Sequence, residues 1–159
     1  TKPAEEKTVL DVVVWSGSGA SLVAKRYRPA LDHFDVLVVA GGPSTRQMEH
    51  DTELASYLAS YPHNRILASV CTGALLLGAA GRLQGKRATT HASAFDRLAS
   101  YGATLAPQEE RVVDQGNIIT AGGVTAGIDL GIHLVARLEG DDVAREVARR
   151  MEWRAAPPL

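Results

Sequence analysis

The sequence contains a single cysteine among its 159 residues. One cysteine excludes an internal disulfide, and it also excludes zinc and iron–sulfur sites that are built from several thiolates. The histidines and carboxylates do not have the spacing of a recognised metal motif either, so we expect no metal. A lone thiol is typical of a reducing compartment, which predicts a cytoplasmic protein.

Aromatic residues and long basic runs are also scarce. Aromatics make up 5% of the chain, and 17 Lys and Arg residues stand against 18 Asp and Glu residues, which gives a net charge of −1. The basic clusters are no longer than pairs such as Lys25-Arg26. This composition argues against nucleic acid as a partner.

Long apolar runs are absent as well. No stretch has the length needed to cross a bilayer, and residues 1–7 lack the apolar core of a signal peptide. We therefore expect a soluble protein with no membrane partner. Apolar residues make up 45% of the chain, which is enough to build the core of a single domain over residues 1–159.

Segments typical of strands and helices alternate along the chain. Aliphatic, β-branched runs predict strands buried on both faces at residues 8–15, 35–40 and 65–70. Further strands are predicted at residues 21–27, 87–90, 103–106, 111–113 and 117–120, and helices at residues 51–60, 72–80, 92–101, 124–138 and 141–153. The alternation predicts an α/β three-layer sandwich, with a mainly parallel sheet between two layers of helices.

Two loops at the carboxyl edge of this sheet carry unusual chemistry, and function concentrates at that edge in such folds. One is Gly41-Gly42-Pro43, and the other begins at Cys71, between a buried strand and an all-apolar helix. A residue in such a strand-to-helix turn is expected to be strained, and the free N–H groups of the helix favour a thiolate. The alternative is that Cys71 is a small core residue, as most free cysteines are.

The neighbours of Cys71 suit a reactive thiol. Gly73 lets a substrate or backbone approach closely, and Thr72 adds a hydroxyl beside the sulfur. The backbone N–H groups of Thr72 and Gly42 together could stabilise a developing negative charge.

Several motifs together resemble the ThiJ/PfpI superfamily, which has the class I glutamine amidotransferase-like fold. They are residues 39–43 (VAGGP), 70–74 (VCTGA), 88–91 (ATTH) and 120–129 (TAGGVTAGID). Thr72 after the cysteine, together with Glu152-Trp153 and the final Pro-Pro-Leu, is similar to the isocyanide hydratase branch. The resemblance implies a flavodoxin-like arrangement of the sheet and its helices.

The resemblance also implies an activity and a site. Cys71 would be the nucleophile of a lyase-type hydratase, Thr72 would contact the substrate, and Gly42 with Thr72 would be the oxyanion-type donors. The thiolate would attack the terminal carbon of an isocyanide, a carboxylic acid would protonate the thioimidate, and water would release an N-substituted formamide. The implied partners are a small-molecule substrate and a second subunit in a homodimer, with no cofactor.

The chain departs from this family at its start. Members usually open with one further strand and helix, and the loop between them supplies the catalytic Asp or Glu. The present sequence resembles the family only from the second strand onward, so this acid has no counterpart. Glu5 and Glu6 do not follow a strand and do not fit the motif.

Two alternatives remain open at this stage. His91 either orients or activates Cys71, or it is a helix-entry residue bonded to backbone, while His133 is expected at the surface or in a dimer face. Instead of a hydratase, the domain could be a non-catalytic or redox-sensing module that uses Cys71. It could also be a small-molecule amidase or deglycase, for which His91 would matter more than Thr72.

Overall fold

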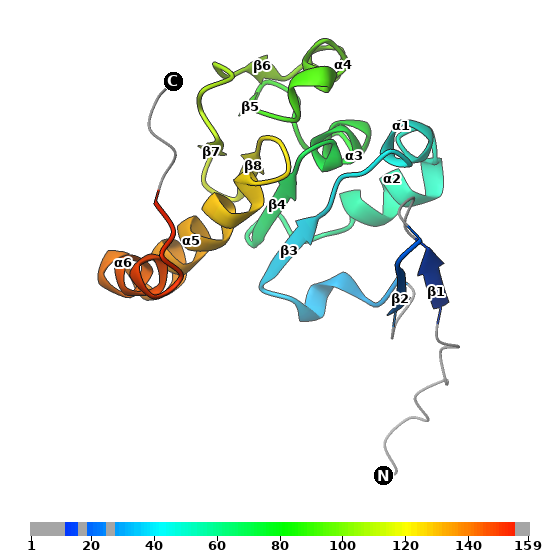
Figure 1. Ribbon diagram of the computed structural model, residues 1–159. Coiled ribbons are helices and arrows are strands. Elements are labelled where there is room, and N and C mark those ends of the chain that lie inside the picture. The colour runs from blue at the N-terminus through cyan, green and yellow to red at the C-terminus, as the bar shows by residue number, and fades with distance from the viewer. Residues whose placement is uncertain (1–11, 16–18, 25–27, 155–159) are drawn as a thin grey trace.

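The computed structural model describes residues 12–15, 19–24 and 28–154. The strands of its central sheet are, in spatial order, β3 (Val36–Val39), β4 (Ile66–Val70), β8 (Ile118–Ala121) and β7 (Val112–Asp114) (Figure 1). The first three are parallel and β7 is antiparallel to β8. The register sets Leu37 beside Leu67 and Leu67 beside Ile118. The predicted, mainly parallel sheet is confirmed.

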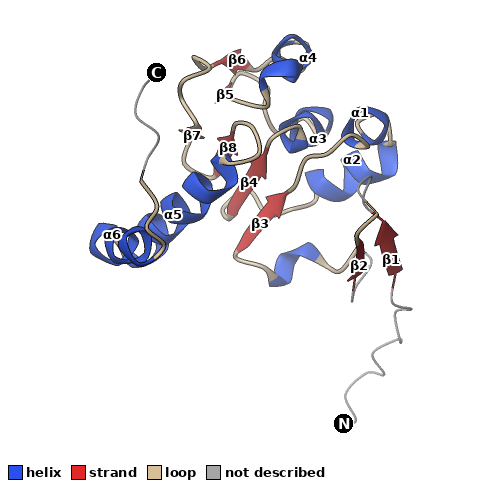
Figure 2. Cartoon of the chain, viewed as in Figure 1, coloured by secondary structure: helices blue, strands red, loops and turns tan. Residues whose placement is uncertain are grey.

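Helices cover both faces of this sheet. They are α1 (Thr45–Met48), α2 (Thr52–Ala59), α3 (Gly73–Ala79), α4 (Phe95–Ala99), α5 (Ala126–Glu139) and α6 (Asp141–Arg150) (Figure 2). Leu67 of β4 packs in a cluster with Leu75 of α3, whereas the next residue, Ala68, packs in a second cluster with Leu130 of α5. Successive residues of a strand point to opposite faces, so the three-layer sandwich is confirmed. None of the helices in the described ranges combines the length and apolar character that a bilayer crossing requires.

Helix α3 is the most deeply buried helix of the fold. Its first six residues, from Gly73 to Gly78, are all buried, as the apolar sequence predicts. It contacts α1, α2 and α4, and its Leu75 and Leu77 are completely inaccessible to solvent. The strand that leads into it, β4, packs against it, since Leu67 and Leu75 belong to one core cluster.

The N-terminal strand differs from the prediction. Residues 8–11 lie outside the described residues, and β1 (Val12–Trp15) pairs antiparallel with β2 (Ser21–Ala24) in a separate two-stranded sheet. Only residues 16–20 separate the two strands, which is too short for the crossover that parallel strands need. In the described part of the chain β3 pairs only with β4, and Val38 on it is 47% exposed.

The segment between α3 and β7 is also more broken than predicted. The strands expected at residues 87–90 and 103–106 shorten to β5 (Arg87–Ala88) and β6 (Thr104–Leu105), which pair with each other outside the main sheet. The single helix expected at residues 92–101 is a 3₁₀ turn, η2 (Ala92–Ala94), followed by α4. His91 caps this turn, so the chain tightens before the α-helix begins.

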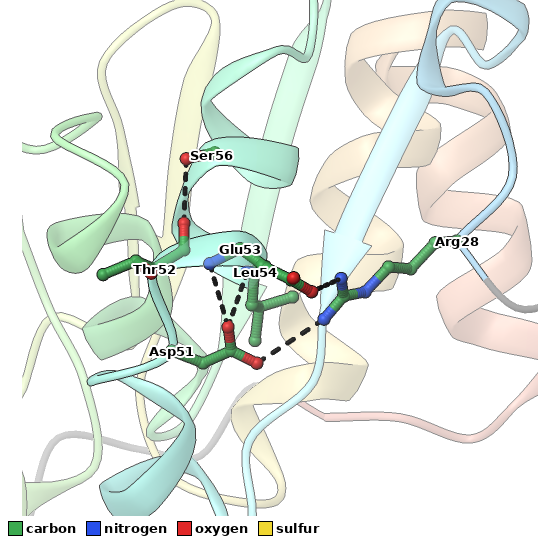
Figure 3. A network of polar contacts seen from close by, with 6 residues as sticks. All are labelled: Arg28, Asp51, Thr52, Glu53, Leu54 and Ser56. Carbon is green, nitrogen blue, oxygen red and sulfur yellow. Dashed lines mark hydrogen bonds and ion pairs between the residues drawn. The ribbon is translucent and has the colours of Figure 1, made fainter.

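A polar network holds the start of α2 to the segment that follows β2 (Figure 3). The Asp51 carboxylate accepts hydrogen bonds from the backbone N–H groups of Glu53 and Leu54, at 2.9 and 3.0 Å, as an N-cap. The Arg28 guanidinium donates to Glu53 at 2.9 Å and to Asp51 at 3.5 Å. One arginine therefore joins a distant loop to the capped end of the helix.

Candidate active site

Cys71 follows the last residue of β4 directly and has a φ of +60°. This left-handed conformation is costly for a residue with a Cβ atom, so the predicted sharp, strained turn is confirmed. The backbone holds it in place, because Cys71 N donates to Ala121 O at 3.0 Å and to Gly122 O at 2.8 Å. The residue is partly exposed rather than fully buried, which argues against a pure packing role.

Two glycines allow the turn and the β3–α1 loop to approach each other closely. A Cβ on Gly73 would collide with the carbonyl oxygen of Val39. A Cβ on Gly41 would lie 2.7 Å from Thr72 N and 2.9 Å from Cys71 Cβ. Glycine at both positions is what brings the loop after β3 against the residue that carries the thiol.

The Thr72 hydroxyl is tied into this loop. Gly42 N donates to Thr72 Oγ1 at 3.0 Å, and the Thr45 hydroxyl lies 2.8 Å from Thr72 Oγ1 and 2.6 Å from Gly42 O. Thr72 and Thr45 are both buried. The Gly42 N–H was expected to be free to stabilise a developing negative charge, but it donates to the Thr72 hydroxyl. To act as an oxyanion-type donor, Gly42 N–H must exchange this hydrogen bond for one to a substrate.

Thr90 and His91 approach the turn from the segment after β5. The Thr90 hydroxyl donates to Cys71 O at 2.8 Å. His91 Nδ1 accepts from Ser93 N at 3.2 Å and lies 2.9 Å from Ser93 Oγ. Within the described ranges no hydrogen bond joins His91 to Cys71, so the contacts of its Nδ1 match the helix-entry alternative.

A cavity of about 160 Å³ opens beside the turn. Its lining residues come from three segments: Thr90, His91, Ala92 and Phe95, then Gln108 and Arg111, then Gly122, Gly123 and Ala126. Thr90 and Gly122 are also the hydrogen-bond partners of Cys71. The cavity is therefore adjacent to the backbone of the thiol-bearing residue.

Carboxylates are absent from this network. No carboxylate oxygen in the described part of the chain is hydrogen-bonded to Cys71, Thr72 or Gly42. Glu49, close in sequence to Thr45, is buried but paired with Arg97. Glu5 and Glu6 lie outside the described residues, and no cluster of three metal-ligating side chains occurs among those that are described.

Thr45 and the short helix α1 that carries it were not predicted from the sequence. The Ser44-Thr45 pair directly after Gly41-Gly42-Pro43 was the available signal, since hydroxyl residues after a Gly-Pro turn commonly open a helix. His133 lies away from the turn: its Nε2 is 2.7 Å from Asp114 Oδ2, and Arg137 donates to the same oxygen at 2.5 Å. The His133 side chain is 33% exposed, which fits the expected surface position, and the dimer-face alternative stays a prediction.

Comparison with known proteins shows the family of this chain. The model of the DJ-1/PfpI family matches residues 11–137. An isonitrile hydratase of Pseudomonas putida is 45% identical over 126 residues, covering 79% of this chain and 54% of the hydratase. The HTH-type transcriptional regulator CdhR of Pseudomonas aeruginosa is 32% identical over 139 residues, covering 86% of this chain and 41% of the regulator.

Among solved structures, a ThiJ/PfpI family protein from Pseudomonas syringae superposes with a TM-score of 0.80 at 38% identity. The match covers 96% of this chain and 63% of that protein. The fold is that of flavodoxin-like α/β proteins, and this chain belongs to the DJ-1/PfpI family. It spans about half the length of the curated relatives named here.

Proposed function

We propose that this chain carries the nucleophile of an isocyanide hydratase-like enzyme, with Cys71 as the attacking residue. The observation that carries the proposal is the position of Cys71: a partly exposed residue at φ +60°, between a buried strand and a buried helix. The 45% identity to an isonitrile hydratase supports the choice of reaction. The proposed substrate is a small molecule that reaches the thiol from the cavity of about 160 Å³.

The reaction adds water to an isocyanide, R–N≡C. The Cys71 thiolate attacks the terminal carbon, which takes a proton, and the product is a neutral thioimidate, S–CH=N–R. Water then adds across the C=N bond, with its hydroxyl on the carbon and a hydrogen on the nitrogen. The carbon–sulfur bond breaks with its electron pair on sulfur, the hydroxyl proton returns to the conjugate base of the acid, and N-substituted formamide leaves with the thiolate restored. The Thr72 N–H stabilises developing negative charge, joined by Gly42 N–H once its bond to the Thr72 hydroxyl opens.

The first proton requires an acid near the thiol. By resemblance this is a carboxylic acid, and none is bonded to the site among residues 28–154. We therefore propose that the chain alone turns over slowly and that a carboxylic acid accelerates it.

Incubating the protein with a simple alkyl isocyanide and following formamide by NMR tests the proposal. The wild type is expected to produce formamide, and Cys71→Ala is expected to produce none above the buffer rate. Cys71→Ser is the matched control, because it keeps the size and polarity of the side chain but not the thiolate. Equal rates for all three proteins would overturn the assignment.

A redox-sensing role is the second candidate, favoured by the partial exposure of the only cysteine. Dilute peroxide would then convert the Cys71 thiol to a sulfenic acid, adding one oxygen atom and releasing water. Intact-mass spectrometry distinguishes the candidates: a selective adduct that dithiothreitol reverses, in a protein inert toward isocyanides, supports the sensor.

We also propose a homodimer, in a cytoplasmic setting. The exposed apolar side chains Leu138, Val143 and Met151 on and beside α5 and α6 support a protein contact there. Light scattering after gel filtration tests it, and a monomer at high micromolar concentration would contradict it.

A further inference from the structure

A chain of three side chains runs from α1 to the rim of the cavity beside Cys71. Arg46 Nη2 donates to Ser93 Oγ at 3.1 Å, and Ser93 Oγ lies 2.9 Å from His91 Nδ1. The backbone N–H of Ser93 also donates to His91 Nδ1, at 3.2 Å. These contacts connect α1 to the segment after β5.

The chemistry of the groups fixes the direction of each hydrogen bond. A guanidinium has donors only, so Ser93 Oγ accepts from Arg46 and its own hydrogen is free for His91. Nδ1 therefore faces two donors, the Ser93 hydroxyl and the Ser93 backbone N–H. A nitrogen that accepts cannot carry the ring proton, so the neutral imidazole is protonated at Nε2.

The Nε2 edge of the His91 ring lies against the loop after β8, whose Gly122 is hydrogen-bonded to Cys71. A Cβ on Gly123 would be 3.2 Å from His91 Cδ2 and 3.8 Å from His91 Nε2. Gly122, next to it, accepts the hydrogen bond from Cys71 N, and both glycines line the cavity with His91. No atom in the described part of the chain accepts a hydrogen bond from Nε2.

We propose that His91 is held as the neutral Nε2–H tautomer and that this N–H donates a hydrogen bond to the nitrogen of the substrate-derived thioimidate. The role in turnover rests on the proposed function. The thioimidate nitrogen has a lone pair and no hydrogen, so it suits a donor that keeps its proton. The hydrogen bond draws electrons from the C=N carbon and favours the attack of water, and no proton leaves the imidazole.

The size of the cavity limits the substrate class. Its volume of about 160 Å³ is below the range of about 300 to 1,000 Å³ that is typical of ligand pockets. The preferred ligand is therefore a short alkyl isocyanide, and a bulky aryl isocyanide is expected to react more slowly.

The tautomer is tested first, without any substrate. Long-range ¹H–¹⁵N correlation spectra of the whole ¹⁵N-labelled chain at pH 7 report both ring nitrogens of the five histidines. The His91 signals are assigned by their loss in His91→Gln. We expect an unprotonated Nδ1 and a protonated Nε2. A protonated Nδ1, in either the other tautomer or the imidazolium, overturns the inference whatever the enzyme does.

Turnover is tested with two variants that separate the donor from the cap. His91→Gln keeps an N–H near the Nε2 position, whereas His91→Asn keeps an oxygen that caps η2 but loses that donor. We expect kcat to stay within about threefold for Gln and to fall about 10- to 100-fold for Asn, the cost of one lost hydrogen bond. Equal kcat losses in the two variants overturn the role in turnover.

The two proposals fail in different ways. If the wild type gives no formamide, the hydratase proposal falls, and the tautomer spectrum still decides the state of His91. N-propylformamide supplies a readout that needs no turnover, because its carbonyl can accept from the same donor. Its titration is expected to move the His91 Nε2–H signal in the wild type and in Cys71→Ala alike. A signal unmoved at saturating formamide would contradict a donor that faces the cavity.

Discussion

At the scale of single residues, the conformation of Cys71 has an energetic consequence. With φ at +60°, any side chain at this position is strained, whereas glycine adopts the same conformation freely. We expect Cys71→Gly to be more stable than Cys71→Ala by about 1 kcal/mol. Urea unfolding of the two variants measures the difference. An alanine variant as stable as the glycine variant would mean that the backbone relaxes and the turn is not strained.

The hydrogen bonds of Thr72 could not be predicted from the sequence. Thr72 follows the thiol in the sequence, which marked it as a candidate, but the sequence could not show that its hydroxyl bonds the Gly42 amide and Thr45. Gly42 and Thr45 follow β3, whereas Thr72 follows β4, and the pairing of these two strands brings the three residues together. Local motifs identify the residues of such a site, and tertiary packing decides their bonds.

At the scale of elements, the N-cap of α2 by Asp51 is expected to stabilise the helix. Asp51→Ala is expected to destabilise the protein by about 1 kcal/mol, because two backbone N–H groups lose their acceptor. Asp51→Asn keeps an acceptor and loses only the charge that faces Arg28, so its loss should be smaller. Chemical denaturation measures both. Equal losses would mean that the contact with Arg28, rather than the cap, carries the effect.

The junction of β7 and α5 gives a pH dependence. Burial raises the pKa of Asp114, but hydrogen bonds from His133, Arg137 and the Gly116 backbone outweigh it, so its pKa lies below the ordinary value. A lowered folded-state pKa adds stability above the unfolded-state pKa, about 4, and that stability is lost as pH falls through the folded-state pKa. We expect the wild type to be more stable than Asp114→Asn at pH 5.

As the pH falls through the folded-state pKa of Asp114, this advantage should shrink, because the carboxyl is then protonated in the wild type too. Thermal unfolding of both proteins from pH 5 to pH 2.5 measures it. A gap between the two proteins that does not change with pH would contradict the assignment.

Elements with a continuous apolar sequence were predictable, and very short ones were not. The apolar sequences of β4 and α3 suit buried elements, and both are found within one residue of the predicted bounds. By contrast β5 and β6 have two residues each, too few to carry a period. Helix α1 has four residues and was missed for the same reason.

At the scale of the whole molecule, the layers follow from the sequence but the position of the first hairpin does not. The alternation of strands and helices fixes a covered, mainly parallel sheet. The run of β-branched residues before Trp15 predicts a strand without showing which strand it joins. In the described ranges it joins β2 and leaves one side of β3 unpaired.

Among the described residues no carboxylate is hydrogen-bonded to Cys71, Thr72 or Gly42, which leads to a prediction for the whole chain. Added acetate or formate at pH 5 to 6 is expected to raise the rate of formamide production, because a small acid supplies the proton that the described site lacks. The rate should rise with acid concentration at constant pH and ionic strength, and Cys71→Ala should not respond. A rate independent of the acid would indicate that the proton already has a source in the protein.

The most direct test is to identify the atom that an isocyanide attacks. The protein is mixed with excess alkyl isocyanide, quenched in acid within seconds, digested and analysed by tandem mass spectrometry. The account predicts an adduct of one isocyanide on the sulfur of Cys71 that decays as formamide appears. Formamide that appears with no adduct on Cys71, or at an equal rate in Cys71→Ala, would contradict it.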